Sequence, residues 1–495
     1  MRHLSITLLG LMGCGDTVTH IHHHYDVDPT PGGEAPPEPP VAATTTPDAL
    51  RLDLLHEDNN LFWIGVSLET LDALNAPYTD GGGGFPEGNG VYDPDGGPSG
   101  LSTETLLVMN PEGDIADFGL VDVKLVGQST GSAWTSATIP NFRLDSDDFV
   151  PGQTFGGVEH IRLNNAQVGS MFGEVSALEI FRGLGVPAAR ATYAWVGGTG
   201  WEDGELLVPM IAREVYKGDF CKENAALLGG GCVSVREGVG DINYAGAAIN
   251  FECDYGDCND TTTFDALAEL INVSYGSQDF DESTAAYLDW DAFMRSSCAH
   301  WLLWVGDDYV HNTNNVVLVE GEDGLFRFLP YSTDINAGYA WGGAYSDTAL
   351  WGFASLSDGC RQDESCREAM YDTCEAVIDE LEALDGVSLI HDLADRLLNA
   401  QAPWGEHPEG MWRGPDVNAY AHYLKFHEGR VEEARAELAV YRAGGWDSGG
   451  WDTGGGWDTG GGWDTGGGKD TGGGQDSGGF ERSGTVAKDA GLSAP

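Results

Sequence analysis

Short apolar runs and helically spaced apolar residues divide the chain into two parts. In the first part, apolar runs are bounded by Gly, Pro, Asn and Asp, which is the pattern of β-strands. The predicted strands span residues 61–67, 106–109, 119–126, 142–144, 193–196 and 206–211. In the second part apolar residues recur at helical spacing, and the predicted helices span 264–273, 290–305, 374–384, 388–400 and 419–441. The sequence therefore predicts an α+β fold, with a mixed sheet in its N-terminal part and helices in its C-terminal part.

Two helices are also predicted within the first part, at residues 68–75 and 170–184. The second should end at Gly185 and Pro187, because Gly followed by Pro is a common helix stop. Residues 78–100 are rich in Gly and Pro and predict a surface loop.

Acidic and amide residues surround a hairpin predicted from residues 316–319 and 325–329. Asp308 and Asn315 precede this hairpin and Asp334 follows it, so we expect the three side chains to converge at its mouth. Protein kinases combine an Asp that orients the acceptor hydroxyl with an Asn and a second Asp that hold magnesium. The alternative is that these residues only form turns, because Asp and Asn readily bond to their own backbone.

This segment resembles the core of the CotH kinase family, the spore-coat atypical kinases. In that family an Asp precedes an Asn at the head of an aromatic strand, and a Trp-Asp-x-Asp motif follows a short hairpin. Asp308 and Asn315 fall on the first two positions, and Asp334 falls on the last Asp of the motif. Tyr331 and Ser332 stand where the family has Trp and Asp, so one family carboxylate is absent.

Other segments extend the resemblance to residues 61–441. Residues 178–188 are similar to the family's Leu-Phe-Arg-x-x-Gly-x-Pro-Ala segment, and residues 422–430 resemble its closing helix. Residues 124–130 occupy the place of an Arg-Gly-x-Ser segment but lack its Arg. The resemblance implies an atypical protein-kinase-like fold.

The resemblance also implies an activity, the transfer of phosphate from ATP to Ser or Thr of a surface or secreted protein. Asp308 would orient the acceptor hydroxyl, while Asn315 and Asp334 would hold Mg²⁺ on the phosphates. ATP and Mg²⁺ are therefore the expected cofactors, and a protein of the cell surface or envelope is the expected substrate.

Two further residues are candidates for the cofactor site. Glu214 lies at about the position of a family Glu that follows a hairpin, and Lys124 could replace the missing phosphate-binding cation. Arg143 and Arg162 are candidates for the same replacement. The alternatives are a solvated Glu at a strand end and ordinary surface cations.

Two other functions remain open. The missing cations and Ser332 favour a kinase-like binding or scaffold module that performs no chemistry. A third alternative keeps ATP but changes the reaction, for example to adenylylation, because a fold does not fix a function.

The composition is strongly acidic, with 24 Lys and Arg residues against 79 Asp and Glu residues and a net charge of −55. This balance excludes nucleic-acid binding, which requires a basic surface, and disfavours direct attraction to anionic membranes. An acidic protein also repels ATP at long range, so a nucleotide site would need magnesium or local cations.

The N-terminus predicts export. Arg2 and His3 precede an apolar run that ends in Leu11-Met12-Gly13-Cys14, which is the pattern of an export signal and is too short to span a bilayer. The same residues resemble the bacterial lipobox, which implies acylation of Cys14. We therefore expect a lipid-anchored protein of the cell envelope, at the outer membrane or cell surface.

Composition also predicts the domain boundaries. Residues 1–13 form the predicted signal peptide, and residues 14–48 form a flexible tether rich in Pro and Thr. The kinase-like domain is predicted at residues 49–443, and residues 444–495, with repeated Trp-Asp pairs and many Gly, form a predicted disordered tail.

The remaining cysteines are read as disulfides, because an even number of Cys is typical of exported proteins. Cys221–Cys232 and Cys253–Cys258 are our hypotheses for two local pairs, within a predicted insertion at residues 221–262. The second pair encloses a loop whose oxygen-rich residues could bind Ca²⁺, although it lacks the EF-hand spacing and an ordinary turn is the alternative. The candidate calcium ligands are Asp254, Asp257 and Asp260.

Overall fold

The computed structural model describes residues 43–50, 60–79, 100–126, 140–166, 170–198, 208–244, 246–340, 343–344, 349–398 and 414–444. They belong to one compact unit. The predicted signal peptide with Cys14, most of the predicted tether, most of the 78–100 loop and the predicted tail lie outside the described residues.

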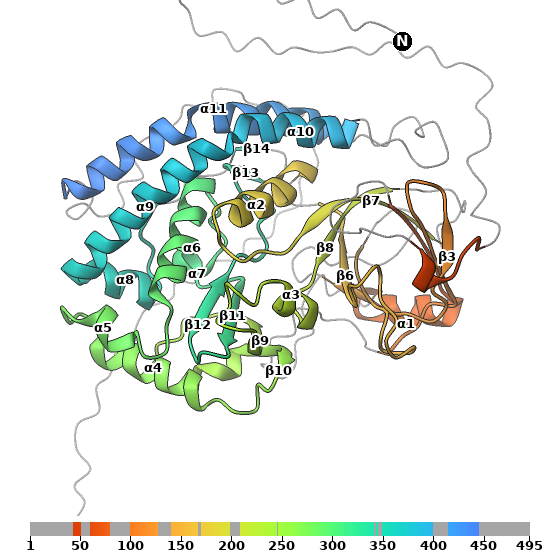
Figure 1. The fold of residues 1–495 in the computed structure, drawn as a ribbon, viewed down its shortest axis with the longest axis horizontal. Helices are drawn as coiled ribbons and strands as arrows, with labels where there is room; N and C mark the ends of the chain where they lie inside the picture. The colour runs from red at the N-terminus through yellow and green to blue at the C-terminus, as the bar shows by residue number, and fades with distance from the viewer. Residues whose placement is uncertain are drawn as a thin grey trace, which may run out of the picture. The chain divides into compact units, whose positions relative to one another are not determined.

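The first sheet has eight strands in the order β3-β2-β1-β7-β8-β6-β5-β4 (Figure 1). All neighbouring strands are antiparallel except β1 and β7, so the predicted mixed sheet is confirmed. The pattern did not predict the short strands β3 and β6 of this sheet. The strands are β1 Asn60–Gly65, β2 Thr105–Met109, β3 Ile115–Asp117, β4 Asp122–Val126, β5 Asn141–Asp145, β6 His160–Asn164, β7 Ala191–Gly198 and β8 Val208–Glu214.

Strand alternation places apolar and charged side chains on opposite faces of this sheet. Successive side chains of a strand point to opposite faces. In β6, Ile161 and Leu163 are fully buried in a core with Phe142 and Met210. The residue between them, Arg162, therefore points to the opposite face.

The second sheet has four antiparallel strands in the order β10-β9-β11-β12. They are β9 Cys232–Gly238, β10 Phe251–Gly256, β11 Val316–Gly321 and β12 Phe326–Leu329. The hairpin predicted around residues 316–329 is β11–β12. Residues 221–262, which we described as an insertion, supply the inner strand β9 and are thus integrated into the sheet, since apolar Val235 pairs with Val319 of β11.

Helices form most of the C-terminal part, as predicted (Figure 1). Two helices belong to the N-terminal half, α1 Leu68–Thr79 and α2 Met171–Gly183, and two short strands, β13 Tyr339–Ala340 and β14 Gly343–Ala344, form a separate pair. The other helices are α3 Gly218–Glu223, α4 Thr262–Ser274, α5 Phe280–Thr284, α6 Trp290–Leu303, α7 Tyr309–Asn312, α8 Ser355–Gln362, α9 Glu364–Leu384, α10 Gly386–Leu398 and α11 Gly414–Arg442. No helix in the described ranges is long and apolar enough to cross a membrane.

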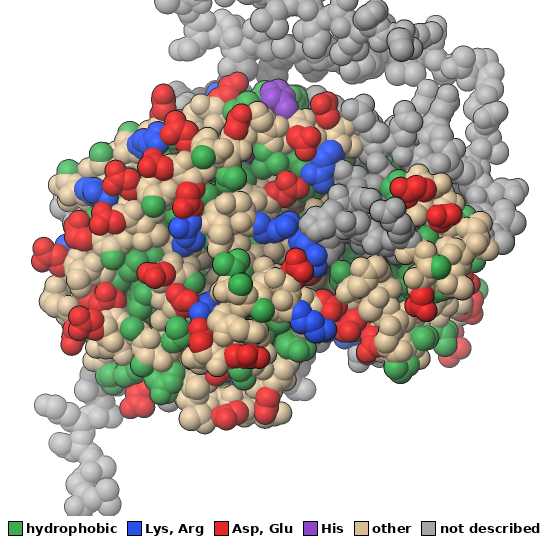
Figure 2. All heavy atoms as spheres, viewed as in Figure 1, with side chains coloured by type: hydrophobic (Ala, Val, Ile, Leu, Met, Phe, Trp, Pro, Cys, Tyr) green, Lys and Arg blue, Asp and Glu red, His purple; other side chains and the backbone are tan. Residues whose placement is uncertain are grey.

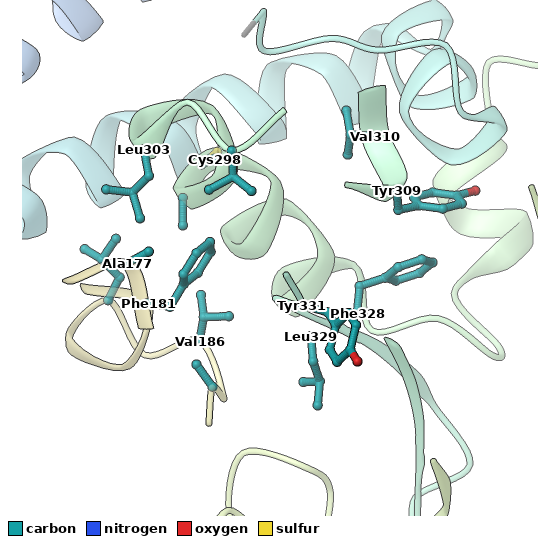
Figure 3. Packing of buried hydrophobic residues seen from close by; sticks show 14 of the residues in the cluster. Ala177, Phe181, Val186, Cys298, Leu303, Tyr309, Val310, Phe328, Leu329 and Tyr331 are labelled. Atoms are coloured by element: carbon teal, nitrogen blue, oxygen red, sulfur yellow. The ribbon is translucent and has the colours of Figure 1, made fainter. Parts of the chain in front are cut away.

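Helix α6 is the central buried element of this part. Asp289 caps its N-terminus by accepting a hydrogen bond from the Ala292 N–H at 3.0 Å. Figure 3 shows Cys298 and Leu303 of this helix close to Ala177 and Phe181 of α2. Because α6 is held on several sides, the loop that follows it has a fixed starting point.

The C-terminal end of α6 is held by Arg430 of α11, which is fully buried. Its guanidinium donates to the Leu302 carbonyl at 2.9 Å and to Glu437 at 2.9 Å. Cationic donors suit a helix C-terminus, where backbone carbonyls have no intrahelical partner. This contact anchors the chain immediately before the segment that carries the sequence-predicted site.

Candidate functional site

Asp308 begins the short helix α7 and is almost completely buried, at 3% exposure. Its Oδ1 accepts hydrogen bonds from the His311 backbone N–H and from His311 Nδ1, both at 2.8 Å. His311 Nε2 lies 2.6 Å from the Ala349 carbonyl. Because both acceptors lack a proton to give, both ring nitrogens must donate, and the imidazole is therefore a cation.

The charges of this pair stabilise each other. Burial alone would raise the pKa of Asp308, but the charge and hydrogen bonds of His311 outweigh it and lower that pKa. Burial would lower the pKa of His311, but Asp308 raises it instead. One oxygen of Asp308, Oδ2, is buried and accepts no hydrogen bond from the described residues.

The neighbouring Asp307 is more accessible than Asp308. Its carboxylate accepts hydrogen bonds from the side-chain amides of Asn314 at 2.9 Å and Asn315 at 2.7 Å. The Asn315 amide also donates to the Asp307 carbonyl at 3.0 Å. Asn315 thus fixes the carboxylate of Asp307, a residue that the sequence analysis did not select.

Asp334 leaves the same end of the β11–β12 hairpin as Asn315, because Val317 pairs with Leu329. Its carboxylate accepts a hydrogen bond from the Ser332 hydroxyl at 3.1 Å. Loss of hydration and the charge of Glu174 raise the pKa of Asp334 to about 7. The chain therefore enters β11 after Asn315 and leaves β12 toward Asp334 at the same end of the hairpin, while among the described residues no hydrogen bond or ion pair joins Asp308 to Asp334.

Helix α2 approaches the Asp334 segment closely. A Cβ on Gly173 would lie 3.1 Å from the Asp334 carbonyl and 2.6 Å from the Tyr423 hydroxyl, so only Gly fits there without a shift. The Asn336 amide also donates to the Gly173 carbonyl at 2.8 Å. This contact places Glu174, the next residue of α2, beside Asp334.

Four cationic residues lie directly opposite one another across four neighbouring strands. Lys124 of β4 pairs with Arg143 of β5, Arg143 with Arg162 of β6, and Arg162 with Arg213 of β8. Paired residues of adjacent strands share a face, so these residues form one row, which we call the cation row. Like charges placed opposite each other destabilise a sheet, and this arrangement is unexpected in so acidic a chain.

The buried end of the cation row has specific partners. Arg213, at 4% exposure, donates to Glu174 at 2.7 Å. Arg162 donates to the Tyr331 hydroxyl at 2.6 Å. Both guanidinium groups also lie over the Tyr331 ring, at 5.9 Å for Arg162 and 5.0 Å for Arg213. The Nε atoms of both arginines are buried and donate to none of the described residues.

Glu214 and Lys124, the two predicted cofactor residues, have different positions. Glu214 forms an ion pair with Arg190 at 2.6 Å and accepts a second bond from Arg190 Nε at 3.1 Å. It follows Arg213 and so points away from the cation row, whereas Lys124 belongs to that row and is partly exposed, as Arg143 and Arg162 are.

Sequence reasoning overlooked Glu174 and Arg213 and left Arg162 as one of several candidates. A signal was present, because each row residue is a lone cation inside an apolar strand. Recognising that these cations form one row would also have required the pairing register of the four strands.

The three candidate calcium ligands do not gather around one point. Asp257 accepts from the Asn259 N–H at 3.1 Å, and Asp260 accepts from the Thr262 N–H at 3.0 Å, which are turns of the ordinary kind. Asp254 instead hydrogen-bonds to Glu237 of β9. Within the described ranges, no three His, Cys, Asp or Glu side chains form a metal-binding group.

Eight cysteines form four disulfides, which include both hypothesised pairs. The two others are Cys298–Cys374, which joins α6 to α9, and Cys360–Cys366. Disulfides form and persist outside the cytoplasm, so the structure agrees with an extracytoplasmic location.

The arrangement of the site is similar to that of a protein kinase. Such enzymes place a strand cation against a Glu on a neighbouring helix, a catalytic Asp before a hairpin and a metal-binding Asp after it. Here the corresponding positions are Arg213 with Glu174, the Asp307–Asp308 segment, and Asp334.

Comparison with known proteins agrees with this arrangement. No curated protein matches the chain. The family described as CotH kinase protein matches residues 127–399, which is more than half of the chain. The match includes three members of the cation row, the segment from Asp307 to Asp334 and helix α2, while β1 to β4 precede it and α11 follows it. The chain therefore belongs to the CotH kinase family.

Proposed function

We propose that this protein is a kinase of the cell envelope that transfers the γ-phosphoryl group of ATP to a Ser or Thr hydroxyl of an exported protein. The observation that carries the proposal is the cation row beside Glu174 and Asp334. A chain with a net charge of −55 can attract a polyanion only where cations are concentrated. The row concentrates four of them in one line.

The residues present fit both cofactors. Arginine side chains suit phosphate because several N–H donors point in one plane, and the buried Nε atoms of Arg162 and Arg213 remain available within the described structure. Asp334 suits Mg²⁺, which usually takes one or two carboxylates from a protein and its other ligands from phosphate and water. A bound Mg²⁺ would neutralise charge on the phosphate oxygens.

The transfer itself requires a group that orients the acceptor hydroxyl. In the proposed step the hydroxyl oxygen forms a bond to the γ-phosphorus, the bond from that phosphorus to the bridging oxygen breaks, and ADP leaves. The hydroxyl proton passes to a carboxylate in the 307–308 segment. Asp307 is accessible and held by two amides, whereas Asp308 is buried against His311, so Asp307 joins Asp308 as a candidate for this role.

A kinase-like binding module is the second candidate function. It is favoured by Ser332, which stands in place of a family carboxylate and only donates a hydrogen bond to Asp334. Such a module would bind nucleotide or a surface partner without transferring phosphate.

Phosphorylation assays with purified full-length chain, ATP and Mg²⁺ separate these functions. We expect Asp307→Asn and Asp334→Asn to lower phosphate incorporation at least about 100-fold, because they remove the proton acceptor and the metal ligand. Asp114→Asn, which changes an exposed carboxylate just before β3, is the matched control. Mass spectrometry of the product distinguishes phosphate from adenylate.

Two outcomes contradict the kinase. Incorporation that survives in both variants shows that neither carboxylate takes part. A Mg²⁺-dependent increase in melting temperature with ATP, without any product, supports the binding module instead.

We also propose that the protein is anchored through a lipid on Cys14, with the outer membrane or cell surface as its location. The four disulfides support export. Metabolic labelling with a palmitate analogue, compared between the natural chain and Cys14→Ser, tests the anchor. Equal labelling of both would reject it.

A further inference from the structure

The β9–β10 hairpin forms one side of the second sheet, where β9 pairs with β11 of the other hairpin. The disulfide Cys253–Cys258 closes its β10 strand, and Cys221–Cys232 fixes the start of β9. Adjacent residues of β9 point to opposite faces. Arg236 lies over the Phe264 ring on one side, so Glu237 points to the other side.

Glu237 is connected to the cation row through Tyr331. Its carboxyl group hydrogen-bonds to Tyr331, whose hydroxyl accepts from Arg162 at 2.6 Å. It also hydrogen-bonds to Asp254 of β10. The side chain is 5% exposed, and its Oε1 is buried without a hydrogen bond from the described residues.

Charged groups from several elements surround this carboxyl pair. Four cations interact with the pair, Arg143, Arg162 and Arg213 of the first sheet and Lys217 at the start of α3. Of the other acids, Glu252 of β10 pairs with Glu237, and Glu174 of α2 interacts with Arg162. Mutual repulsion among the cations is therefore relieved by carboxyl groups of the same chain.

We propose that Glu237 and Asp254 are built-in counter-ions of the cation row, and that a bound polyphosphate competes with them for the same guanidinium groups. This inference rests on the proposed role of the row as the phosphate subsite. It assigns a function to the disulfide-closed hairpin, because its two carboxyl groups set how strongly the row attracts an anion.

The proposal predicts a dependence on protons. Burial and the charge of Asp254 raise the pKa of Glu237 to about 8. Below that pH the pair retains a proton, the row keeps more of its positive charge, and anions bind more tightly. Above it both carboxylates are charged, more of the positive charge of the row is offset, and anion affinity falls.

Calorimetric titration of the full-length chain with inorganic tripolyphosphate, without metal, at pH 7 and pH 9 tests this. We expect Glu237→Gln to bind the probe about tenfold more tightly than the natural chain at pH 9 and with little difference at pH 7. Titration of the probe itself affects both proteins equally and cancels in the comparison. Glu269→Gln, an exposed carboxylate on α4, should behave as the natural chain does.

Unchanged or weaker binding by Glu237→Gln at pH 9 would overturn the inference, while ATP transfer by the natural chain would leave the proposed function standing. If no protein binds the probe at either pH, the row is not a phosphate subsite and both proposals fail. Should Glu237→Gln not fold, as judged by its thermal melting curve, Asp254→Asn takes its place with the same expectation.

Discussion

The cation row and the 305–315 loop obtain their order in different ways. In the loop, the carboxylates form hydrogen bonds with residues close in sequence. Asp308 binds His311, and Asp307 binds Asn314 and Asn315, all within nine residues. The row joins residues that are far apart in sequence and places like charges side by side. Hydrogen bonds between residues close in sequence favour stability, whereas a row of incompletely compensated charges favours binding.

This difference predicts where substitutions act. Changes to the loop and its supports should lower the free energy of unfolding, because buried bonds are lost. Changes to the partly exposed cations of the row should lower anion affinity with little loss of stability, because each removed cation also removes repulsion. Arg213 is the exception, since its removal would leave buried Glu174 without its partner.

The largest expected effect is on the support of the loop. Cys298–Cys374 joins α6, which leads into the loop, to α9 across a sequence separation of 76. Replacing both cysteines by Ala should lower the free energy of unfolding by about 4 kcal/mol, against about 2 kcal/mol for the five-residue Cys253–Cys258 pair. Denaturant unfolding of both double variants measures the difference, and equal losses would show that loop length does not set the effect here.

The second prediction concerns Asp308 itself. Asp308→Asn leaves the His311 cation without its buried counter-ion and should cost roughly 3 kcal/mol of stability. The pKa of Asp308 is lowered, so its contribution is lost as pH falls through that folded pKa; the pKa of His311 is raised, so its contribution is lost as pH rises through its folded pKa. The difference between variant and natural chain should therefore be largest between these two pKa values.

Chemical denaturation at several pH values checks that window. A cost that does not vary with pH would mean that Asp308 acts as a helix cap only. His311→Gln keeps a side-chain donor but no charge. Its loss of stability should therefore vary with pH in the same way as that of Asp308→Asn.

The smallest effect on stability is expected in the row. Lys124→Thr removes a partly exposed cation opposite Arg143 and places a good strand former in β4. We expect stability to change by less than about 1 kcal/mol, while affinity for tripolyphosphate falls roughly tenfold. A large loss of stability with unchanged affinity would reverse the comparison and place the row among the structural elements.

The same contrast explains what could be predicted from the sequence. The helices and the β11–β12 hairpin follow from local periodicity, and the predicted 290–305 helix is α6 Trp290–Leu303. The cation row could not be predicted, because a register shift of one residue would move each cation to the other face. The pairing of β9 with β11 shows the same limit, since the partner strand lies about 80 residues further along the chain.

The candidate site was predicted only in part, because a motif does not show which way a side chain points. The family motif selected Asp308, Asn315 and Asp334 as residue types in order. It carried no information on which of two adjacent Asp side chains is buried, so Asp307 was overlooked. Glu214 was selected instead of Arg213 for the same reason, because the fold decides to which face of the sheet each side chain of β8 points.

The single parallel pairing of β1 with β7 has a consequence for shortened versions of the protein. A chain limited to residues 127–399, the part that matches the family, would lose β1 to β4 and expose β7 and β5 as new sheet edges. All eight residues of β7 are buried, and a long apolar edge strand is a template for intermolecular pairing. Such a fragment should aggregate. The strands before the matched region therefore prevent self-association by pairing with the edges of β7 and β5.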